Sequence, residues 1–338
     1  MSYKSWPKGT ITADNGETQT AIAPLIISAS RSTDIPAFYG QWFLNRLNAG
    51  YVKWINPWSG KSTYVSFENT RVIVFWTKNP APLIPLLHEI DKRKINYYFQ
   101  FTVNDYETEK LEPGIPPLDE RLETFARLSD MIGPARVLWR FDPLLLTDAL
   151  GPEELGMRIC RIGKTLGRKT GRCTISFIAC YKKVASNLAR SGIRMRIWDA
   201  ESRSVVLKAI AGMSRESGIS CVSCADENDR SVVGILPGRC IDGNLIIREF
   251  GHDEKVSDFF GYVRTYPSAV DHQEDSIGKD FKDRGQRRAC GCCVSKDIGS
   301  YNTCGHQCVY CYANSSPERA FGNCRKVSNS AGSILSVK

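Results

Sequence analysis

The stretch Val72-Ile-Val-Phe-Trp-Thr-Lys-Asn79 contains five apolar residues in a row and then three polar ones. A predicted helix at Leu83–Asp91 follows it, and Tyr97-Tyr-Phe-Gln-Phe-Thr-Val103 is a second, largely apolar run. Runs that are apolar on both faces are typical of strands buried in a parallel sheet whose two sides are covered by helices. The order strand, helix, strand therefore predicts an α/β unit here.

The same alternation continues on both sides of this unit. Further strands are predicted at Leu25–Ser30, Arg136–Phe141, Cys173–Cys180 and Ser220–Cys224, further helices at Ile35–Leu47, Asp119–Ile132, Glu153–Leu166 and Ser202–Ser217, and a hairpin at Tyr51–Ile55 and Thr63–Phe67. Several such units in a row predict a full or partial (β/α) barrel of the TIM type. A doubly wound open sheet is the alternative, although no Gly-x-Gly-x-x-Gly turn of the dinucleotide-binding kind follows the first strand.

The pattern predicts one barrel domain over residues 23–325, which includes a cysteine-rich, cluster-binding segment at 285–316. Residues 1–22 are mostly polar without periodicity and are expected to be a flexible leader, and residues 326–338 a flexible tail. No apolar stretch is long enough to span a bilayer, and the first residues lack the apolar core of a secretory signal. We therefore expect a soluble cytoplasmic protein without a membrane partner.

The chain contains 13 cysteines, and ten of them follow residue 220. In a reducing compartment, so dense a set favours metal binding over a disulfide framework. The net charge of +9 is a weak indication of an anionic partner such as nucleic acid. A basic solvated surface is the simpler explanation, because no run of basic residues is long enough to form a nucleic-acid-binding arm.

The most informative cysteine spacing lies in Tyr301-Asn-Thr-Cys304-Gly-His-Gln-Cys308-Val-Tyr-Cys311-Tyr-Ala-Asn314. Three thiolates in one compact loop can bind three irons of a [4Fe–4S] cluster. The fourth iron would then lack a protein ligand and would stay open to a small molecule with oxygen and nitrogen donors.

This spacing resembles the cluster motif of the radical S-adenosylmethionine superfamily, in which an aromatic residue such as Tyr310 precedes the last cysteine. The resemblance implies that Cys304, Cys308 and Cys311 bind the cluster, and that the open iron binds the amino and carboxylate groups of S-adenosylmethionine. It further implies that an electron from the reduced cluster cleaves the sulfonium to give a deoxyadenosyl radical, which abstracts hydrogen from a substrate. A reductant such as a flavodoxin or a ferredoxin is the implied electron donor.

The Tyr-Cys-Tyr-Ala ending looks most like the spore photoproduct lyase branch, which makes nucleic acid a candidate substrate by analogy. That superfamily's motif normally follows the first strand, whereas here it lies near the C-terminus. A circular permutation would explain the difference, with Ile298–Asn302 as the first barrel strand, Ser316–Arg325 as its helix and the Leu25 strand as the second. The Gly-Gly-Glu segment that often binds the cofactor's amino group is missing.

The whole chain also resembles the family described as domain of unknown function 1848. The matching stretches are Ser28–Pro36, Phe75–Pro80, Tyr98–Thr102, Trp139–Pro143 and Cys290-Gly-Cys292 through Asn314. This resemblance supports the fold and the cluster and implies no particular reaction.

Two other metal sites are open alternatives. The motif cysteines could bind zinc, with Cys290, Cys292 or His306 as the fourth ligand. Separately, Cys224, Cys240, Cys290 and Cys292 are candidates for a second [4Fe–4S] cluster or a zinc site, since four thiolates would close such a site and give it a structural or electron-relay role. Burial of Cys221 and Cys224 as small apolar strand residues is the competing interpretation.

Polar residues follow several predicted strands and are expected to share one site at the carboxyl edge of the sheet. Arg140 and Asp142 are two residues apart, so an extended chain directs both to one face, where they could bind the cofactor or act in catalysis. Structural ion pairs with other loop residues are the competing interpretation. Lys78 and Arg31 are candidates for binding an anionic substrate, with solvated surface charges as the alternative. The candidates for cofactor binding are Arg31, Asp34 and Tyr310. The other polar strand ends are Ser30, Thr33, Thr77, Asn79, Gln100, Thr102, Asn104, Tyr181, Lys182, Asp226 and Glu227.

Overall fold

Eight parallel strands form the central sheet of the computed structural model, which describes residues 5–179, 181–226, 233–262, 278–279 and 281–334. In spatial order the strands are β12 (Lys296–Asp297), β3 (Ile26–Ala29), β6 (Val72–Thr77), β7 (Asn96–Thr102), β8 (Val137–Leu144), β9 (Arg172–Phe177), β10 (Ser220–Cys224) and β11 (Leu236–Gly238). Every neighbouring pair is parallel. Strand β12, the last strand of this sheet in the sequence, therefore lies at one edge of the sheet, next to β3.

The predicted α/β class with a parallel sheet is confirmed, but the sheet is not a closed barrel. Within the described residues, β11 and β12 each pair with one neighbour and form the two edges of an open sheet. These edge strands contain three and two residues, so they offer few backbone groups for a closing pair.

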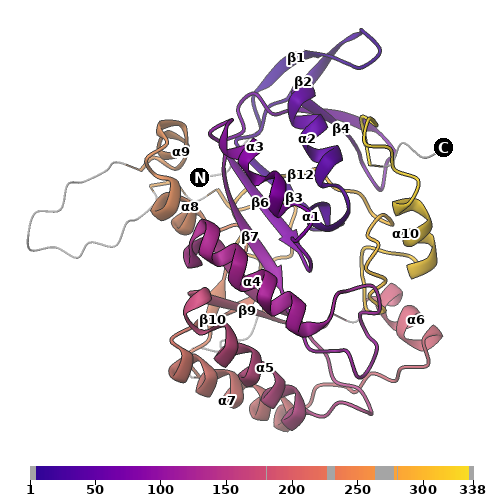
Figure 1. The fold of residues 1–338 in the computed structure, drawn as a ribbon, viewed down its shortest axis with the longest axis vertical. Coiled ribbons are helices and arrows are strands. Elements are labelled where there is room, and N and C mark those ends of the chain that lie inside the picture. The colour runs from indigo at the N-terminus through magenta and orange to yellow at the C-terminus, as the bar shows by residue number, and fades with distance from the viewer. Residues whose placement is uncertain (1–4, 180, 227–232, 263–277, 280, 335–338) are drawn as a thin grey trace, which may run out of the picture.

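Helices connect most of the strands (Figure 1). They are α1 (Ile35–Phe38), α2 (Gly40–Ala49), α3 (Leu87–Asp91), α4 (Leu118–Ile132), α5 (Pro152–Leu166), α6 (Lys182–Arg190), α7 (Ala200–Ser217), α8 (Gly243–Phe250), α9 (Glu254–Phe260) and α10 (Pro317–Cys324). The short helix α6 and the helices α8 and α9 were not predicted. The helix predicted at Ile35–Leu47 is divided into α1 and α2 at Tyr39, whose φ of −130° and ψ of 21° lie outside the helical region.

The two faces of the sheet have different partners. Residues such as Phe75, Phe99 and Trp139 pack with helices that include α4, α5 and α7, and we call this side the α5 face. The alternate residues Val74, Tyr98 and Leu138 pack with α8 and α9, and we call this side the α8 face. Because both faces are covered, the strands are apolar throughout their length, as the sequence indicated.

A second, smaller sheet has the order β1-β2-β5-β4. The predicted hairpin is confirmed as β4 (Tyr51–Ile55) paired antiparallel with β5 (Ser62–Ser66). The segment expected to be a flexible leader instead contains β1 (Lys8–Thr12) and β2 (Thr18–Ile22), which pair antiparallel. The two threonine-rich strands show no apolar pattern, since half of their residues are exposed, and the second partner of β2 is β5, far away in the sequence.

The end of the chain is also packed where it is described. Ala331 O accepts a hydrogen bond from Trp42 Nε1 at 2.7 Å, and Gly332 O accepts one from Lys53 N at 2.9 Å. Ile334 is buried. The segment predicted to be a flexible tail therefore lies against α2 and β4, at least as far as this residue.

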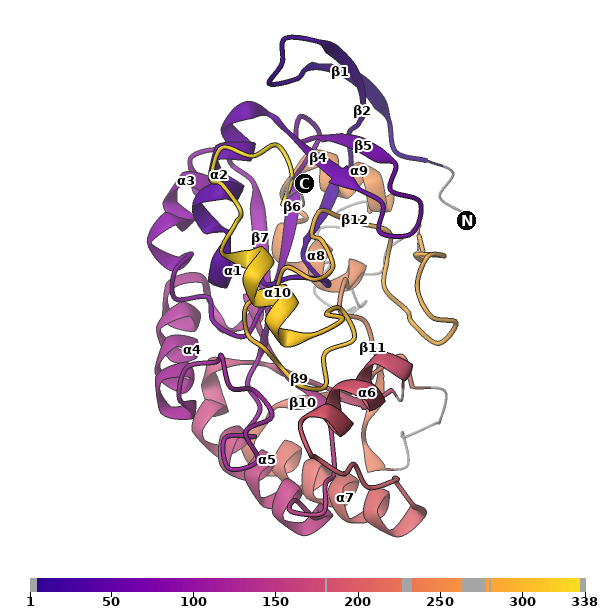
Figure 2. The ribbon, with the colours of Figure 1, turned by 90° about the vertical axis from the view of Figure 1, so that its right-hand side faces the viewer.

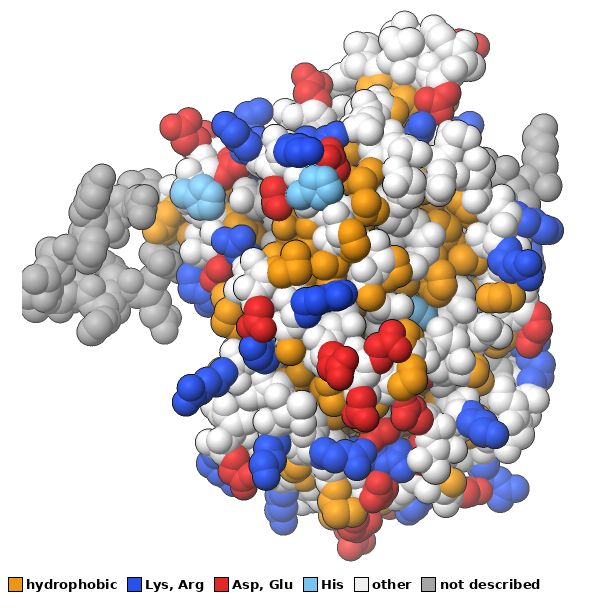
Figure 3. Space-filling model, viewed as in Figure 1, with side chains coloured by type: hydrophobic (Ala, Val, Ile, Leu, Met, Phe, Trp, Pro, Cys, Tyr) orange, Lys and Arg blue, Asp and Glu red, His pale blue; other side chains and the backbone are white. Residues whose placement is uncertain are grey.

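The surface view in Figure 3 shows Lys and Arg side chains interleaved with Asp and Glu side chains. Among the described residues of this face, the basic side chains form no broad continuous patch. The excess positive charge is thus not concentrated on this face. None of the helices in the described ranges is both long and apolar enough to cross a bilayer.

Candidate functional site

The cysteine motif lies at the carboxyl edge of the parallel sheet, after β12. This strand pairs with β3, with Lys296 opposite Ile27 and Asp297 opposite Ser28. Figure 2 shows the segment that follows crossing in front of the sheet near α1 and α6 and entering α10. Because the carboxyl ends of parallel strands share one edge, the motif meets the polar residues that follow β3, β6, β7 and β8.

Asp297 anchors the start of this segment to β3. Its carboxylate accepts hydrogen bonds from the Ser28 hydroxyl at 3.0 Å, the Ser30 hydroxyl at 2.8 Å and the Arg31 backbone N–H at 2.8 Å. The chain then approaches β3 so closely that a Cβ atom on Gly299 would lie 1.9 Å from Ser30 Oγ. Only glycine fits there, so the course of the chain is fixed before the first motif cysteine.

The three motif cysteines belong to one loop. Cys308 is buried, and Cys304 and Cys311 are half-buried. Burial raises the pKa of each thiol, and the charges of Cys304 and Cys311 also raise the pKa of Cys308, so the three sulfurs are within electrostatic range of one another. Asn314 Nδ2 donates a hydrogen bond to Cys304 O at 3.2 Å, which closes the loop on itself.

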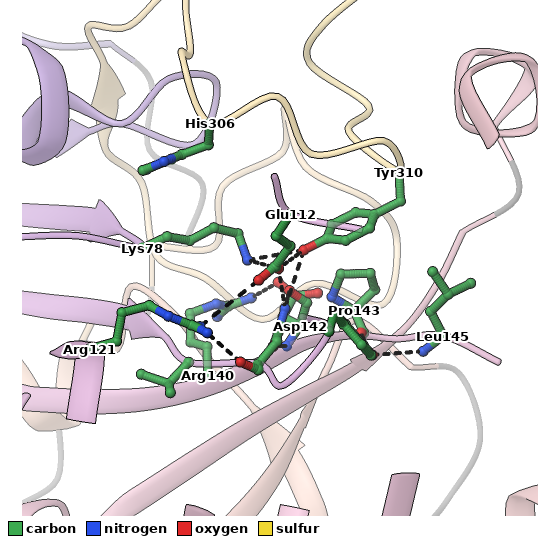
Figure 4. A network of polar contacts seen from close by, with 12 residues as sticks. Lys78, Glu112, Arg121, Arg140, Asp142, Pro143, Leu145, His306 and Tyr310 are labelled. Atoms are coloured by element: carbon green, nitrogen blue, oxygen red, sulfur yellow. Dashed lines mark hydrogen bonds and ion pairs between the residues drawn. The ribbon is translucent and has the colours of Figure 1, made fainter. Parts of the chain in front are cut away.

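Tyr310 places its hydroxyl in a buried network with residues from the segments after β6 and β7 (Figure 4). Its hydroxyl donates to Glu112, and Lys78 Nζ lies 2.7 Å from Glu112 Oε1 and 3.1 Å from the tyrosine oxygen. Asn104 Nδ2 donates to Glu112 Oε1 at 2.8 Å and to Tyr310 at 3.2 Å. Because each polar group has a partner, the network can stay buried and can fix the motif against two loops.

Glu112 carries the negative charge of this network. Burial alone would raise its pKa, but attraction to Lys78 and Arg121 and hydrogen bonds from Lys78 and Tyr310 lower the pKa of Glu112 to about 2. Arg121 NH1 lies 3.9 Å from Glu112 Oε2. The carboxylate is therefore ionised and compensated by two cations at neutral pH.

His306 lies inside the motif loop, and both of its ring nitrogens have partners. Nε2 lies 2.7 Å from Asp34 Oδ2, and Nδ1 lies 3.3 Å from Gly114 O. Asp34 also accepts hydrogen bonds from Lys78 N at 2.7 Å and from Ala37 N at 3.0 Å, which caps α1. This carboxylate thus links the motif to the ends of β3 and β6.

Arg31 and Arg140 stack on one indole. Their guanidinium carbons lie 5.3 Å and 5.0 Å from the ring centroid of Trp76. Arg140 NH2 pairs with Asp142, and Arg140 NH1 donates to Cys240 Sγ at 2.7 Å. Arg31 NH2 is buried and has no hydrogen-bond partner among the described residues. Asp142 compensates the charge of Arg140, and Cys292 and Asp297 interact electrostatically with Arg31.

The four cysteines of the predicted second set meet on the α8 face. Cys240 Sγ lies 3.6 Å from Cys224 Sγ, and interactions with the Cys240 and Cys290 side chains lower the pKa of Cys292. The Ile241 backbone N–H donates to Cys292 Sγ at 3.4 Å. Three separate segments are thereby joined by sulfur contacts. Within the described residues, no group of three or more Cys, His, Asp and Glu side chains is already arranged to hold a metal ion.

Comparison with known families decides where this chain belongs. The family described as Domain of unknown function (DUF1848) matches residues 26–313, from β3 to just past the cysteine motif. The chain belongs to this family. No curated protein and no solved structure matches it. The DUF1848 region contains both cysteine sets and the eight strands of the parallel sheet.

The structure of this DUF1848 protein brings the predicted site residues into three groups. Lys78 and Tyr310 are in direct contact, Asp34 contacts His306, and Arg140 contacts Asp142 and Cys240. Arg31 joins the third group through Trp76. Asp226 ends a described segment, and Glu227 lies outside the described residues.

Three residues of the DUF1848 site were missed from the sequence. Glu112 lies in a segment without periodicity, Asp297 directly precedes the strand predicted at Ile298–Asn302, and Trp76 was taken only as a strand residue. The strand predicted at Ile298–Asn302 begins two residues after the start of the observed strand β12 (Lys296–Asp297). Nothing in the local pattern marked these residues, since their partners are far away in the sequence.

Proposed function

We propose that this DUF1848 protein is an iron–sulfur enzyme of the radical S-adenosylmethionine type. Cys304, Cys308 and Cys311 would bind a [4Fe–4S] cluster with one open iron. When bound, the reduced cluster and S-adenosylmethionine together supply a deoxyadenosyl radical for hydrogen abstraction, with a flavodoxin or ferredoxin as the implied reductant. The observation that carries the proposal is the meeting of this three-thiol loop with the polar carboxyl edge of the sheet.

The order of the strands supports the superfamily resemblance. A permuted chain needs the strand before the motif to lie next to the Leu25 strand, and β12 pairs in parallel with β3 (Ile26–Ala29). The motif then follows the first strand in space although it is late in the sequence. In α/β sheets this carboxyl edge is where ligands bind.

The surroundings of the motif favour a cluster over zinc. A structural zinc site would need a fourth protein ligand, and His306 already uses both ring nitrogens, on Asp34 and Gly114. Cys290 and Cys292 contact the other cysteine set. The remaining nearby thiol is Cys324 on α10, whose sulfur would lie 3.3 Å from a Cβ on Gly305. That thiol is hydrogen-bonded with Tyr39.

The contacts assign positioning roles to several predicted site residues. Lys78 is held by Glu112 and Tyr310, so we infer that it orients the motif and does not bind substrate. Asp34 orients the loop through His306. Arg31 has an unpartnered guanidinium nitrogen, and a carboxylate is the ligand such a group pairs with best.

Anaerobic purification and reconstitution test the proposal. We expect about four irons per cluster and release of deoxyadenosine when dithionite and S-adenosylmethionine are added. Cys304→Ala, Cys308→Ala and Cys311→Ala should each abolish that release. A protein that binds zinc at these cysteines, or that is fully loaded with iron yet releases no deoxyadenosine, would overturn the enzymatic proposal. The latter result would identify an electron-transfer protein.

Cys324→Ala provides the matched control. This thiol lies beside the same loop, and its removal should leave both the iron content and deoxyadenosine release unchanged. If Cys324→Ala lost iron as the motif variants do, the cluster would have a fourth protein ligand and no open iron.

A further inference from the structure

The four cysteines on the α8 face are not used by the proposed cluster. Cys224 ends β10, Cys240 precedes α8, and Cys290 and Cys292 precede β12. Three of the four are buried and Cys224 is half-buried. Their pairwise interactions link four soft ligands, which a purely apolar role for these side chains does not require.

Cys240 is fixed by groups that point at it from the sheet. The Tyr98 hydroxyl donates to Cys240 O at 2.8 Å, and Gln100 Nε2 donates to the same oxygen at 2.7 Å. Arg140 NH1 donates to the sulfur at 2.7 Å. These β7 and β8 side chains orient the thiol as the outer groups of metal sites orient a ligand.

Cys292 is fixed in a similar way by the backbone. Its sulfur accepts a hydrogen bond from Ile241 N at 3.4 Å, and the next residue, Cys293, donates from its backbone N–H to Ile241 O at 3.0 Å. Backbone N–H donors to sulfur stabilise the thiolate form that a metal needs. The 290–293 segment is thus held in register with the residue after Cys240.

The charge around the set matches a metal–thiolate centre. Four thiolates around one divalent cation carry a net charge of −2. Arg140 contacts Cys240 directly, and Cys292 and Cys240 both interact electrostatically with Arg31. The two guanidinium groups that share Trp76 would offset part of that charge, since Arg140 also pairs with Asp142 and Arg31 also interacts with Asp297.

We propose that Cys224, Cys240, Cys290 and Cys292 bind one zinc ion as a tetrahedral tetrathiolate site. Sulfurs around zinc lie about 3.8 Å apart, from Zn–S bonds of roughly 2.3 Å. The separation of 3.6 Å between Cys224 and Cys240 matches that edge. In a [4Fe–4S] cluster each thiolate binds a different iron, so the sulfurs lie further apart.

The four side chains now make pairwise contacts. Binding of the ion would bring all four sulfurs around one point. It would join the end of β10 and the start of α8 to the segment that leads into β12. The two strands β10 and β12 lie at or next to opposite edges of the open sheet. The site would therefore act as a structural clamp across the sheet, independent of the proposed cluster and of its chemistry.

Metal analysis of the triple variant Cys304→Ala/Cys308→Ala/Cys311→Ala separates this site from the proposed cluster. We expect the full-length variant, produced with both iron and zinc available, to keep about one zinc per chain and to stay colourless. Adding Cys240→Ser or Cys292→Ser should remove the zinc. A triple variant that holds iron and is brown, or that holds no metal, would overturn the proposal.

Two controls keep the result interpretable. Cys160→Ser, at a thiol on α5 away from the set, should leave the zinc content unchanged. Should a cysteine variant fail to fold, alkylation of the native chain tests the same point: the four thiols should be protected from iodoacetamide until a chelator is added. Equal alkylation of the four with and without chelator in the native protein would contradict the site.

Discussion

The two cysteine sets of this protein are built in opposite ways. Cys304, Cys308 and Cys311 come from one loop, while the α8-face set takes its thiols from three segments that are separated by up to 68 residues, from Cys224 to Cys292. The first set depends on local spacing and on a network that holds the loop. The second depends on the whole sheet being folded. A site that is local in sequence can be recognised as a motif, whereas a site assembled by tertiary structure becomes visible only through its contacts.

The largest expected effect is that of Cys308→Ala, which should change the metal content of one cysteine set and leave that of the other unchanged. Cys308→Ala should abolish deoxyadenosine release and lower the iron content, because a cluster held by two thiolates is not retained. The same variant should keep its zinc, which elemental analysis measures in one sample. Loss of both metals from a folded Cys308→Ala variant would show that the sets depend on each other and would break the comparison.

A second substitution weakens the support of the motif without touching a thiol. Glu112→Gln removes the charge that compensates Lys78 and Arg121, and breaking such a buried pair should lower the free energy of unfolding by about 3 kcal/mol. Denaturant unfolding measures this change. Glu107→Gln is the matched control: this carboxylate is 52% exposed and 3.6 Å from Arg121, so its loss should cost less than about 1 kcal/mol. Equal effects would mean that the network does not hold the loop.

The pH dependence of the unfolding free energy tests the environment of Lys296, which lies between the two cysteine sets in the sequence. Burial lowers the pKa of Lys296 to about 8 from its usual 10.5. The unfolded chain then binds more protons than the folded one between these values, so stability should rise as the pH increases from about 8 to 10.5.

The gain is at most about 3 kcal/mol, and it is reduced because Lys296 Nζ lies 3.1 Å from the Trp54 ring centroid, which favours the charged form. Lys296→Met should remove this part of the slope. Lys92→Met, at an exposed lysine, should retain it. Identical pH profiles for parent and Lys296→Met would refute the assignment.

The smallest effect concerns a single hydroxyl. Tyr310→Phe leaves the ring in place and removes the group that contacts Glu112, Lys78 and Asn104, so we expect a loss of about 1 kcal/mol in unfolding free energy. Iron binding should persist, because no thiol is removed. Tyr312→Phe, whose hydroxyl donates to Arg31 O at the surface, should change stability less. A larger loss in the Tyr312 variant would reverse this ranking.

Much of the fold could be predicted because its signals are local. Strands such as β6 and β7 are continuous apolar runs, and the hairpin β4–β5 surrounds a turn-rich stretch. The neighbour relation between β12 and β3 followed from the family resemblance, which no single strand pattern could supply. The open edges could not be predicted, since they depend on how few residues pair in β11 and β12.

The candidate site was predictable only in part, for the same reason. The spacing of the three motif cysteines is visible in the sequence, and so are polar strand ends such as Lys78 and Asp34. Glu112 is not, because its segment has no periodicity and its importance comes from partners in other loops. Helices α8 and α9 were missed as well, because they are short and follow a stretch without a strand pattern.

The placement of β12 has a consequence for synthesis. A ribosome makes β3 early, but the strand that pairs with its free side is made after the other seven strands of the sheet. Until then the backbone groups on the free side of β3 are unpaired, and such an edge can pair with other chains and cause aggregation. Insertion of the proposed cluster at the motif would also have to wait for this last stretch to emerge, when most of the scaffold is already in place.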